Sequence, residues 1–162
     1  MLRITRQSDY GIVLMTLFSK GDGSAVLSAR DMAADTNLPL PTVSKILKAL
    51  TRAGLLESTR GVHGGYAATR PTSEISLVDV IEAIEGPIAL TDCVSPENRD
   101  CAIKETCACK DNWQRVNIAI RNALGTISLT DMTPGCRFEE SEANVPDRSG
   151  IEDNTGSQHE LA

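Results

Sequence analysis

Apolar side chains in the first third of the chain recur at spacings typical of short, buried helices. Residues 8–20 contain six of them after Ser8 and Asp9, two potential helix caps, so a largely buried helix closed by a glycine is predicted. Residues 21–27 are rich in glycine, aspartate and serine and predict a turn. Residues 28–34 begin with a serine and an aspartate in a capping-box-like pattern, which predicts a second, shorter helix.

A third helix is predicted to begin near Pro41, because a proline disfavours helical geometry in the residue before it but is favoured at the first helical position. Its apolar face is formed by residues three and four positions apart, Val43, Ile46, Leu47 and Leu50. Three basic residues lie off that face: Lys45, Lys48 and Arg52. A short helix, a tight turn and a second helix with basic residues form a helix-turn-helix pattern.

Residues 55–60 and 66–69 predict two strands joined by a glycine-rich turn at 61–65. A hairpin that follows a helix-turn-helix is a wing, and Arg60 and His63 would lie at its tip, where a thin backbone can approach a DNA groove. The alternatives are an ordinary hairpin turn and a histidine without a role. The order helix, helix, helix, hairpin favours the wing.

The second half of the chain contains two further helical patterns. Residues 76–85 predict a capped helix that ends before Gly86 and Pro87, and residues 112–124 predict a strongly amphipathic helix. The apolar stripe of the latter comprises Trp113, Val116, Ile120, Ala123 and Leu124. Because few partners remain for this stripe within the chain, we expect a dimerisation helix; packing on residues 76–85 is the alternative, and both can hold. Residues 128–131 suggest one more helical turn.

Four of the five cysteines lie in the seventeen residues from Cys93 to Cys109, in the pattern C-x7-C-x5-C-x-C. Proline, asparagine and acidic residues predict a loop there, and so many thiols in such a loop more often hold a metal or a cluster than form disulfides. Zinc is the competing metal, although structural zinc sites favour cysteines paired two to four residues apart. Free surface thiols are the remaining alternative. Cys136 and His159 are treated as incidental.

The net charge of −6 is divided unevenly along the chain. Residues 1–72 contain nine Lys or Arg and five acids, a net charge of +4, so the remainder carries −10. A basic first part favours a polyanionic partner for that part alone, although ordinary scatter of surface charge gives the same figure. Residues 137–162 contain seven acids, two arginines and little apolar content, so 133–162 is predicted to be a disordered acidic tail.

Composition argues against several classes of protein. The 41% hydrophobic content can form a core, and the 3% aromatic content favours one built from aliphatic side chains in helices. No apolar run reaches the roughly 18 residues of a membrane span, and the N-terminus lacks a secretion signal, so we expect a cytoplasmic protein with no membrane partner. Two histidines, and no Ser/His/Asp or paired-carboxylate arrangement, argue against an enzyme.

From Met1 to about Met132 the chain resembles the bacterial iron–sulfur winged-helix regulators of the IscR and NsrR type. The resemblance rests on the N-terminal M-L-R-I-T, on the wing motif R-G-x-x-G-G-Y at Arg60–Tyr66, and on a three-cysteine loop followed by a helix with a tryptophan. Within this group, E-G-P-I-A-L-T-D-C at Glu85–Cys93 and N-W-Q-R-V-N at Asn112–Asn117 look most like the regulator associated with the SUF iron–sulfur assembly system.

The resemblance implies an iron–sulfur cluster, of the 2Fe-2S or 4Fe-4S type, bound by three cysteines: Cys93, Cys101 and Cys107. The fourth ligand of NsrR-like members matches Asp9, and Cys109 is a further candidate. The chain departs from the family pattern in two ways: the first gap between cysteines is seven residues instead of the usual five, and the histidine ligand of IscR-like members falls on Lys110. The alternative for Asp9 is an acid that interacts with the dipole of its helix.

In this family the DNA-contact positions lie at the start of the third helix and on the wing, and they fall here on Pro41, Thr42, Ser44, Lys45 and Arg60. The hydroxyl groups among them can bond bases or phosphates, and Lys45 suits guanine edges or phosphates. Arg60 suits the minor groove, where the potential is most negative. Lys48 and Arg52 are expected to neutralise phosphates, and His63 adds to the wing tip.

These observations predict a mainly α-helical winged helix-turn-helix protein with a long C-terminal dimerisation helix. Its expected parts are a DNA-binding region (1–72), a cluster-binding loop with dimerisation helices (73–132) and the acidic tail (133–162). We expect a homodimeric transcriptional regulator that binds a palindromic double-stranded DNA operator under control of the cluster, with iron–sulfur assembly genes as targets. The alternatives are a nitric oxide or iron-level sensor with other targets, and a zinc- or cluster-containing redox or electron-transfer protein. The basic third helix favours a regulator.

Overall fold

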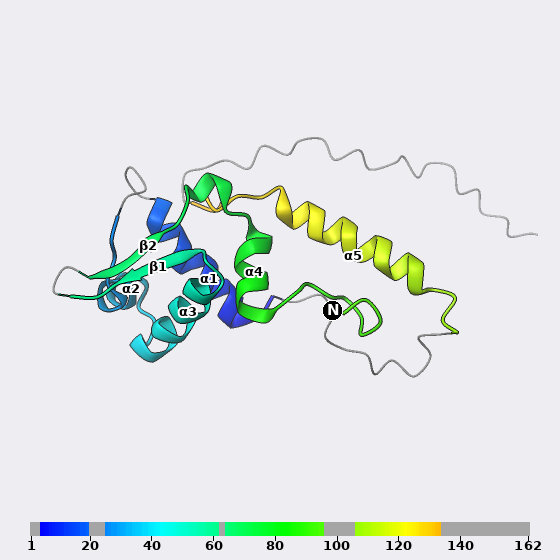
Figure 1. Cartoon of the computed structure of the whole chain (residues 1–162), viewed down its shortest axis with the longest axis horizontal. Coiled ribbons are helices and arrows are strands. Elements are labelled where there is room, and N and C mark those ends of the chain that lie inside the picture. The colour runs from blue at the N-terminus through cyan, green and yellow to red at the C-terminus, as the bar shows by residue number, and fades with distance from the viewer. Residues whose placement is uncertain (1–3, 20–24, 62–63, 96–105, 134–162) are drawn as a thin grey trace, which may run out of the picture.

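The computed structural model describes residues 4–19, 25–61, 64–95 and 106–133. In chain order these form α1 (Arg6–Thr16), a 3-10 turn η1 (Leu17–Ser19), α2 (Ala29–Thr36), α3 (Leu40–Arg52), β1 (Leu56–Thr59), β2 (Gly65–Ala68), η2 (Thr72–Glu74), α4 (Leu77–Glu85) and α5 (Lys110–Gly125). Figure 1 shows α1 to α4 and the two strands gathered at one end, with α5 extending away from them. The described part is therefore mainly helical with one small sheet, as predicted.

Aliphatic side chains from α1, α3 and α4 form most of the core. The residues with no more than 1% exposure include Leu14, Met15, Phe18, Met32, Val43, Leu47, Leu50, Ile75, Val80 and Leu129. Full burial of one such large side chain contributes about 1.5–3 kcal/mol. α1 and α4 approach each other closely at Gly11, where an added Cβ would lie 2.2 Å from Cδ1 of Ile84. The core therefore joins α4 to α1 and to the helix-turn-helix.

The helix-turn-helix consists of α2, a short turn and α3. Ser28 caps α2, because its hydroxyl accepts a hydrogen bond from the backbone N–H of Asp31 (3.1 Å), as the sequence pattern predicts. Asn37 adopts the left-handed conformation with φ of 54°, which ends α2 and turns the chain. α3 begins at Leu40, so the predicted start near Pro41 is confirmed to within one residue.

β1 and β2 form an antiparallel hairpin in which Leu56 lies opposite Ala68. The prediction that residues 21–27 are entirely turn is wrong at its end, because Leu27 bridges to Tyr66 through two backbone hydrogen bonds of 2.9 Å. A single bridging residue leaves no alternating pattern in the sequence, so periodicity cannot reveal it. The helices and the hairpin together make the predicted winged helix-turn-helix.

The start of α1 differs from the prediction. Thr5, rather than Ser8 or Asp9, is the N-cap, and its hydroxyl accepts a hydrogen bond from the backbone N–H of Ser8 (3.3 Å). The Ser8 side chain is fully buried and its hydroxyl donates to the Glu85 carboxylate at the end of α4. The same carboxylate accepts a hydrogen bond from the Thr5 hydroxyl (2.8 Å). A tertiary contact therefore uses the serine that local preference would assign to the cap.

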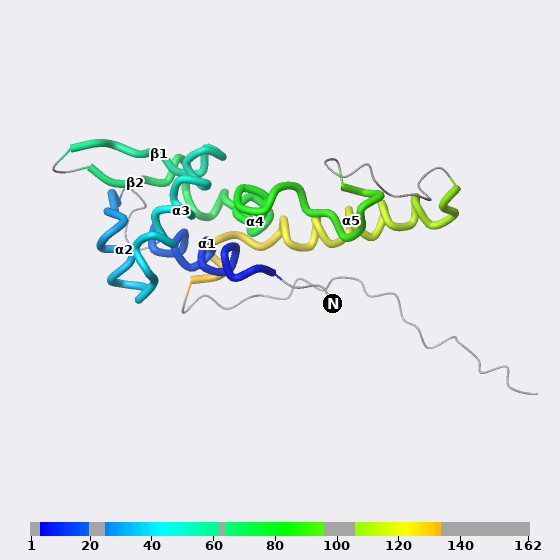
Figure 2. The backbone as a smooth tube through the Cα atoms, turned by 90° about the horizontal axis from the view of Figure 1, so that it is seen from below, coloured from blue at the N-terminus to red at the C-terminus, as the bar shows by residue number. Residues whose placement is uncertain are grey.

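α5 packs against α4 through its C-terminal half, while its N-terminal end extends beyond the other helices (Figure 2). Arg121 forms a two-pronged ion pair with Glu82, with N–O distances of 2.9 and 3.1 Å, and its donated hydrogen bonds lower the pKa of Glu82. The buried Asn117 side chain donates to the Ile88 carbonyl (3.0 Å) and accepts from the Leu90 N–H (3.1 Å). The predicted packing alternative is thus confirmed, and α5 has more partners within the chain than expected.

Residues 126–133 return to the helical body after α5. Leu129 is fully buried, and its backbone N–H donates to the carbonyl of Ile75 (2.9 Å). Hydrogen-bonded turns replace the helical turn predicted here, and Asp131 accepts hydrogen bonds from the Ser128 hydroxyl and N–H, which lower the pKa of Asp131. None of the described helices is long and apolar enough to cross a membrane. The predicted tail lies almost wholly outside the described residues.

Candidate nucleic-acid interface and metal centre

α3 has one buried and one exposed face. The buried face holds the predicted apolar residues and packs on α1, α2 and α4. The residues predicted to contact DNA lie outside this face: Pro41, Ser44, Lys45 and Lys48 are exposed and Thr42 is partly buried. An exposed helix start with hydroxyl and ammonium groups can donate hydrogen bonds to phosphates and to base edges. The structure therefore leaves the predicted contact residues of α3 accessible to a nucleic acid.

Lys45, Lys48 and Arg52 share one side of α3, because they lie three and four residues apart. All three are exposed, and they line a hollow of about 280 Å³ together with Gln7 and Ile84. Within the described ranges the two ion pairs belong to other cations, Arg70 with Asp79 and Arg121 with Glu82. Three neighbouring cations that form no ion pair with a described carboxylate make a surface that attracts a polyanion.

Arg60 follows β1 directly and is exposed. Gly61 has a φ of 120°, which strongly favours glycine. At Gly64 an added Cβ would lie only 2.3 Å from the carbonyl oxygen of Thr59, so the turn closes too tightly for a side chain there. The glycines are thus needed for the hairpin that presents Arg60. His63, also predicted at this tip, lies outside the described residues.

Two of the predicted loop cysteines lie at the N-terminal end of α5. Cys109 precedes the helix and is exposed, whereas Cys107 is partly buried and its carbonyl accepts a hydrogen bond from the Lys110 N–H (3.3 Å). Cys93, at the start of the segment, is partly buried, and its sulfur lies 3.1 Å from the hydroxyl oxygen of Thr91.

The fourth loop cysteine, Cys101, lies outside the described residues. Among the residues that are described, no three His, Cys, Asp or Glu side chains come together in an arrangement that could hold a metal ion. Asp9 is exposed in the first turn of α1, and among the described residues it belongs to no such group of three. The donor set itself suits an iron–sulfur cluster, since such clusters are held mainly by thiolates. The ligand set stays a prediction.

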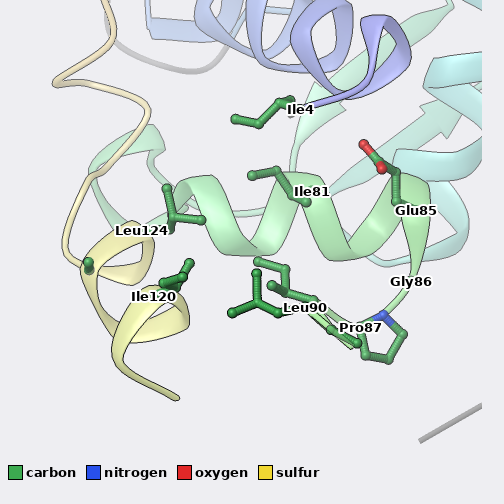
Figure 3. Close-up of a pocket in the computed structure, with 11 residues that line it drawn as sticks. Ile4, Ile81, Glu85, Gly86, Pro87, Leu90, Ile120 and Leu124 are labelled. Carbon is green, nitrogen blue, oxygen red and sulfur yellow. The ribbon is translucent and has the colours of Figure 1, made fainter. Parts of the chain in front are cut away.

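An apolar pocket of about 420 Å³ lies between α4, α5 and the segment that follows α4 (Figure 3). Its apolar lining includes Ile4, Ile81, Ile88, Leu90, Ile120 and Leu124, and Glu85 lies beside it. Sequence reasoning missed both the pocket and the link from Glu85 to Ser8, because each joins parts that are distant in the chain. Glu85 is 77 residues from Ser8, and the pocket brings residues 81–90 together with residues 120–124. The one local signal is Gly86–Pro87, which ends α4 and forces the chain to turn there.

Comparison with known proteins identifies relatives of this arrangement. The family model Rrf2, described as an iron-dependent transcriptional regulator, matches residues 4–135. Protein aau3 of Rhizobium meliloti is 33% identical over 123 residues, which cover 76% of this chain and 75% of that protein. Two solved structures are similar with TM-scores of 0.60. CymR, the global cysteine regulator of B. subtilis, is 28% identical, and the match covers 82% of this chain and 96% of the CymR chain. IscR of T. potens is 26% identical, with coverages of 81% and 85%.

The family match extends over the helix-turn-helix, the wing, the cysteine segment and α5. It confirms the expectations that the chain regulates transcription and that it is not an enzyme. The exposed basic side of α3 and the arginine beside the wing turn are what such a function requires of the fold. This chain belongs to the Rrf2 family of DNA-binding transcriptional regulators.

Proposed function

We propose that this chain is a homodimeric transcriptional regulator whose binding to operator DNA is controlled by an iron–sulfur cluster. The observations that carry the DNA-binding part are the exposed start of α3 and the exposed Arg60 at the end of the first strand of the wing. In this proposal Thr42, Ser44 and Lys45 face base edges in the major groove, Lys48 neutralises phosphates, and Arg60 enters the minor groove. A symmetric dimer reads two half-sites about one helical turn apart.

The proposed ligands of the cluster are Cys93, Cys101 and Cys107, with Asp9 or Cys109 in the fourth position. Thiols at the N-terminus of α5, the description of the family as iron-dependent and the similarity to an IscR structure support this assignment. When bound, the cluster supplies a centre that oxidants, nitric oxide or iron scarcity can alter. A fourth ligand other than a thiolate would leave one corner weaker, which suits a sensor rather than a purely structural site.

Two sets of side-chain hydrogen bonds support a route from the cysteine segment to the DNA-binding helices. Asn117 of α5 holds the backbone at Ile88 and Leu90, just before Cys93. At the start of the same segment, Glu85 holds the buried Ser8 of α1. α1 in turn packs on α3. A change in the position of the segment would therefore shift the helix that carries the proposed DNA contacts.

Operator binding by protein purified without oxygen, before and after removal of iron by a chelator, tests this function. Absorbance and Mössbauer spectra identify the cluster, and salt-matched gel shifts with genomic fragments, including promoters of iron–sulfur assembly genes, measure binding. We expect visible absorption and an affinity that changes at least about tenfold, or about 1.4 kcal/mol, when the cluster is removed. A colourless protein that holds zinc, or equal binding in both states, would contradict the proposal. Cluster-dependent binding to other promoters only would support the proposed regulator function but would show that iron–sulfur assembly genes are not its targets.

The Arg60→Ala substitution tests the wing. It should weaken operator binding by about 1–3 kcal/mol, because one base or minor-groove contact and its charge are lost. Arg115→Ala, which removes an exposed arginine from α5, is the matched control and should leave binding within about 0.5 kcal/mol of the original. If Arg60→Ala binds as tightly as the control at the same salt concentration, Arg60 does not contact the operator.

A further inference from the structure

The basic side of α3 lacks an anionic partner in the described part of the protein. Lys45, Lys48 and Arg52 are exposed around the hollow, and none of them takes part in either of the ion pairs formed there. Uncompensated cations close together repel one another, and a mobile anion can relieve that repulsion. DNA is the anion in the proposed function, and when DNA is absent this surface can attract another polyanion.

The same chain contains a strongly acidic segment after the last described residue, Thr133. Residues 134–162 hold two arginines against seven acids: Glu139, Glu140, Glu142, Asp147, Glu152, Asp153 and Glu160. This segment therefore carries a net charge of −5, most of the −6 of the whole chain. Its composition is too poor in apolar residues to form a core of its own. The chain thus combines a basic surface that has no anionic partner among the described residues with a covalently attached polyanion.

The attachment point allows the segment to reach α3. Thr133 is held to the helical body, since its hydroxyl donates to the carbonyl of the buried Leu129 (3.3 Å). The 29 residues that follow can extend up to about 100 Å, whereas a folded domain of 100 residues has a radius of gyration of only about 13 Å. Attachment to the same chain also gives an effective concentration in the millimolar range. Contacts too weak to persist between separate molecules are therefore populated.

We propose that the acidic segment 134–162 occupies the basic hollow of its own α3, formed by Lys45, Lys48 and Arg52, and competes there with DNA. The segment acts as an internal polyanion that lowers affinity for DNA of any sequence, because it neutralises the cations that bind phosphates. The inference rests on the proposed DNA-binding role of α3, but not on the cluster. It adds to the regulator a means of suppressing non-specific binding.

The competition is tested by measuring the DNA affinity of three forms of the protein. These are the unmodified chain, a chain truncated after Thr133, and a chain of unchanged length with the seven acids replaced by Asn or Gln. On a non-specific duplex at about 50 mM salt, the two altered forms should bind about threefold to tenfold more tightly than the unmodified chain, and the difference should vanish near 300 mM salt. The neutralised chain keeps the length of the segment and removes its negative charge, so it distinguishes an electrostatic effect from a steric one.

Equal affinities of the unmodified and neutralised chains at low salt would overturn the proposal. So would a gain on truncation without a gain on neutralisation, since the effect would then be steric. If no form binds DNA, the proposed function fails, and a measurement without DNA still decides the inference. In that measurement a carbodiimide joins carboxylates to lysine amines that are in contact, and mass spectrometry locates the links.

Links from the acidic segment should fall on Lys45 and Lys48, should decline when a DNA duplex is added, and should form within one chain. Lys110, which is partly buried at the start of α5, is the internal comparison. A mixture of isotopically labelled and unlabelled protein distinguishes links within a chain from links between chains. Links spread equally to Lys110, links only between chains, or their absence from Lys45 and Lys48 would overturn the proposal.

Discussion

Replacement of Cys107 by serine should abolish stable cluster binding and, with it, cluster-dependent operator binding. Loss of a residue that merely supports a metal ligand lowers metal affinity about 10–100-fold, so loss of a ligand itself should lower it at least about 100-fold. The Cys107 side chain is partly buried and lies just before the N-terminus of α5. The measurement is iron and sulfide content per chain, with the visible absorption spectrum, after anaerobic purification.

Cys109→Ser makes the same atomic change two residues away on an exposed side chain, and it tests Cys109 as the fourth ligand. It should retain the cluster if Asp9 completes the set of Cys93, Cys101 and Cys107. Asp9→Ala then addresses the fourth position, where retention of a stable cluster would exclude Asp9. If Cys109→Ser loses the cluster and Cys107→Ser keeps it, the proposed ligand set is wrong.

Val116→Lys should dissociate the dimer. Trp113 and Val116 continue the stripe by which α5 packs on α4, but at the free end of the helix they are 41% and 43% exposed. We propose that a second copy covers them. An unpaired ammonium group in such an interface should raise the dimer dissociation constant at least about 100-fold, or about 2.8 kcal/mol. Sedimentation velocity over a range of concentrations measures it, and operator binding should fall in parallel.

Ile118→Lys provides the control, because Ile118 is similarly exposed, at 47%. Its side chain leaves the helix about 160° away from that of Val116, on the side opposite the stripe. It should leave the dimer intact. Equal dissociation by both substitutions would mean that the dimer interface is not confined to the side of α5 that carries Val116. A dimer unaffected by Val116→Lys would place the interface elsewhere and remove the proposed role of α5.

The sequence alone was sufficient for most of the helical elements and for the class of protein. Buried helices such as α3 leave a stripe of aliphatic residues at spacings of three and four, and their ends carry caps, prolines or glycines that act locally. The capping box of Ser76 and Asp79 at α4 shows how well such local signals are obeyed. The wing was predictable for the same reason, since tight turns require glycine.

Tertiary structure alone decided the features whose parts are distant in the chain. Ser8 is a residue type that commonly caps helices. Because it is buried against α4, its hydroxyl instead donates a hydrogen bond to the Glu85 carboxylate, and Thr5 caps the helix. Asn117 and Arg121 face polar groups of other elements, which no helical periodicity can reveal. A buried polar group must find a partner wherever the fold brings one within reach. The sequence therefore determines which elements form, whereas their packing determines which polar groups join them.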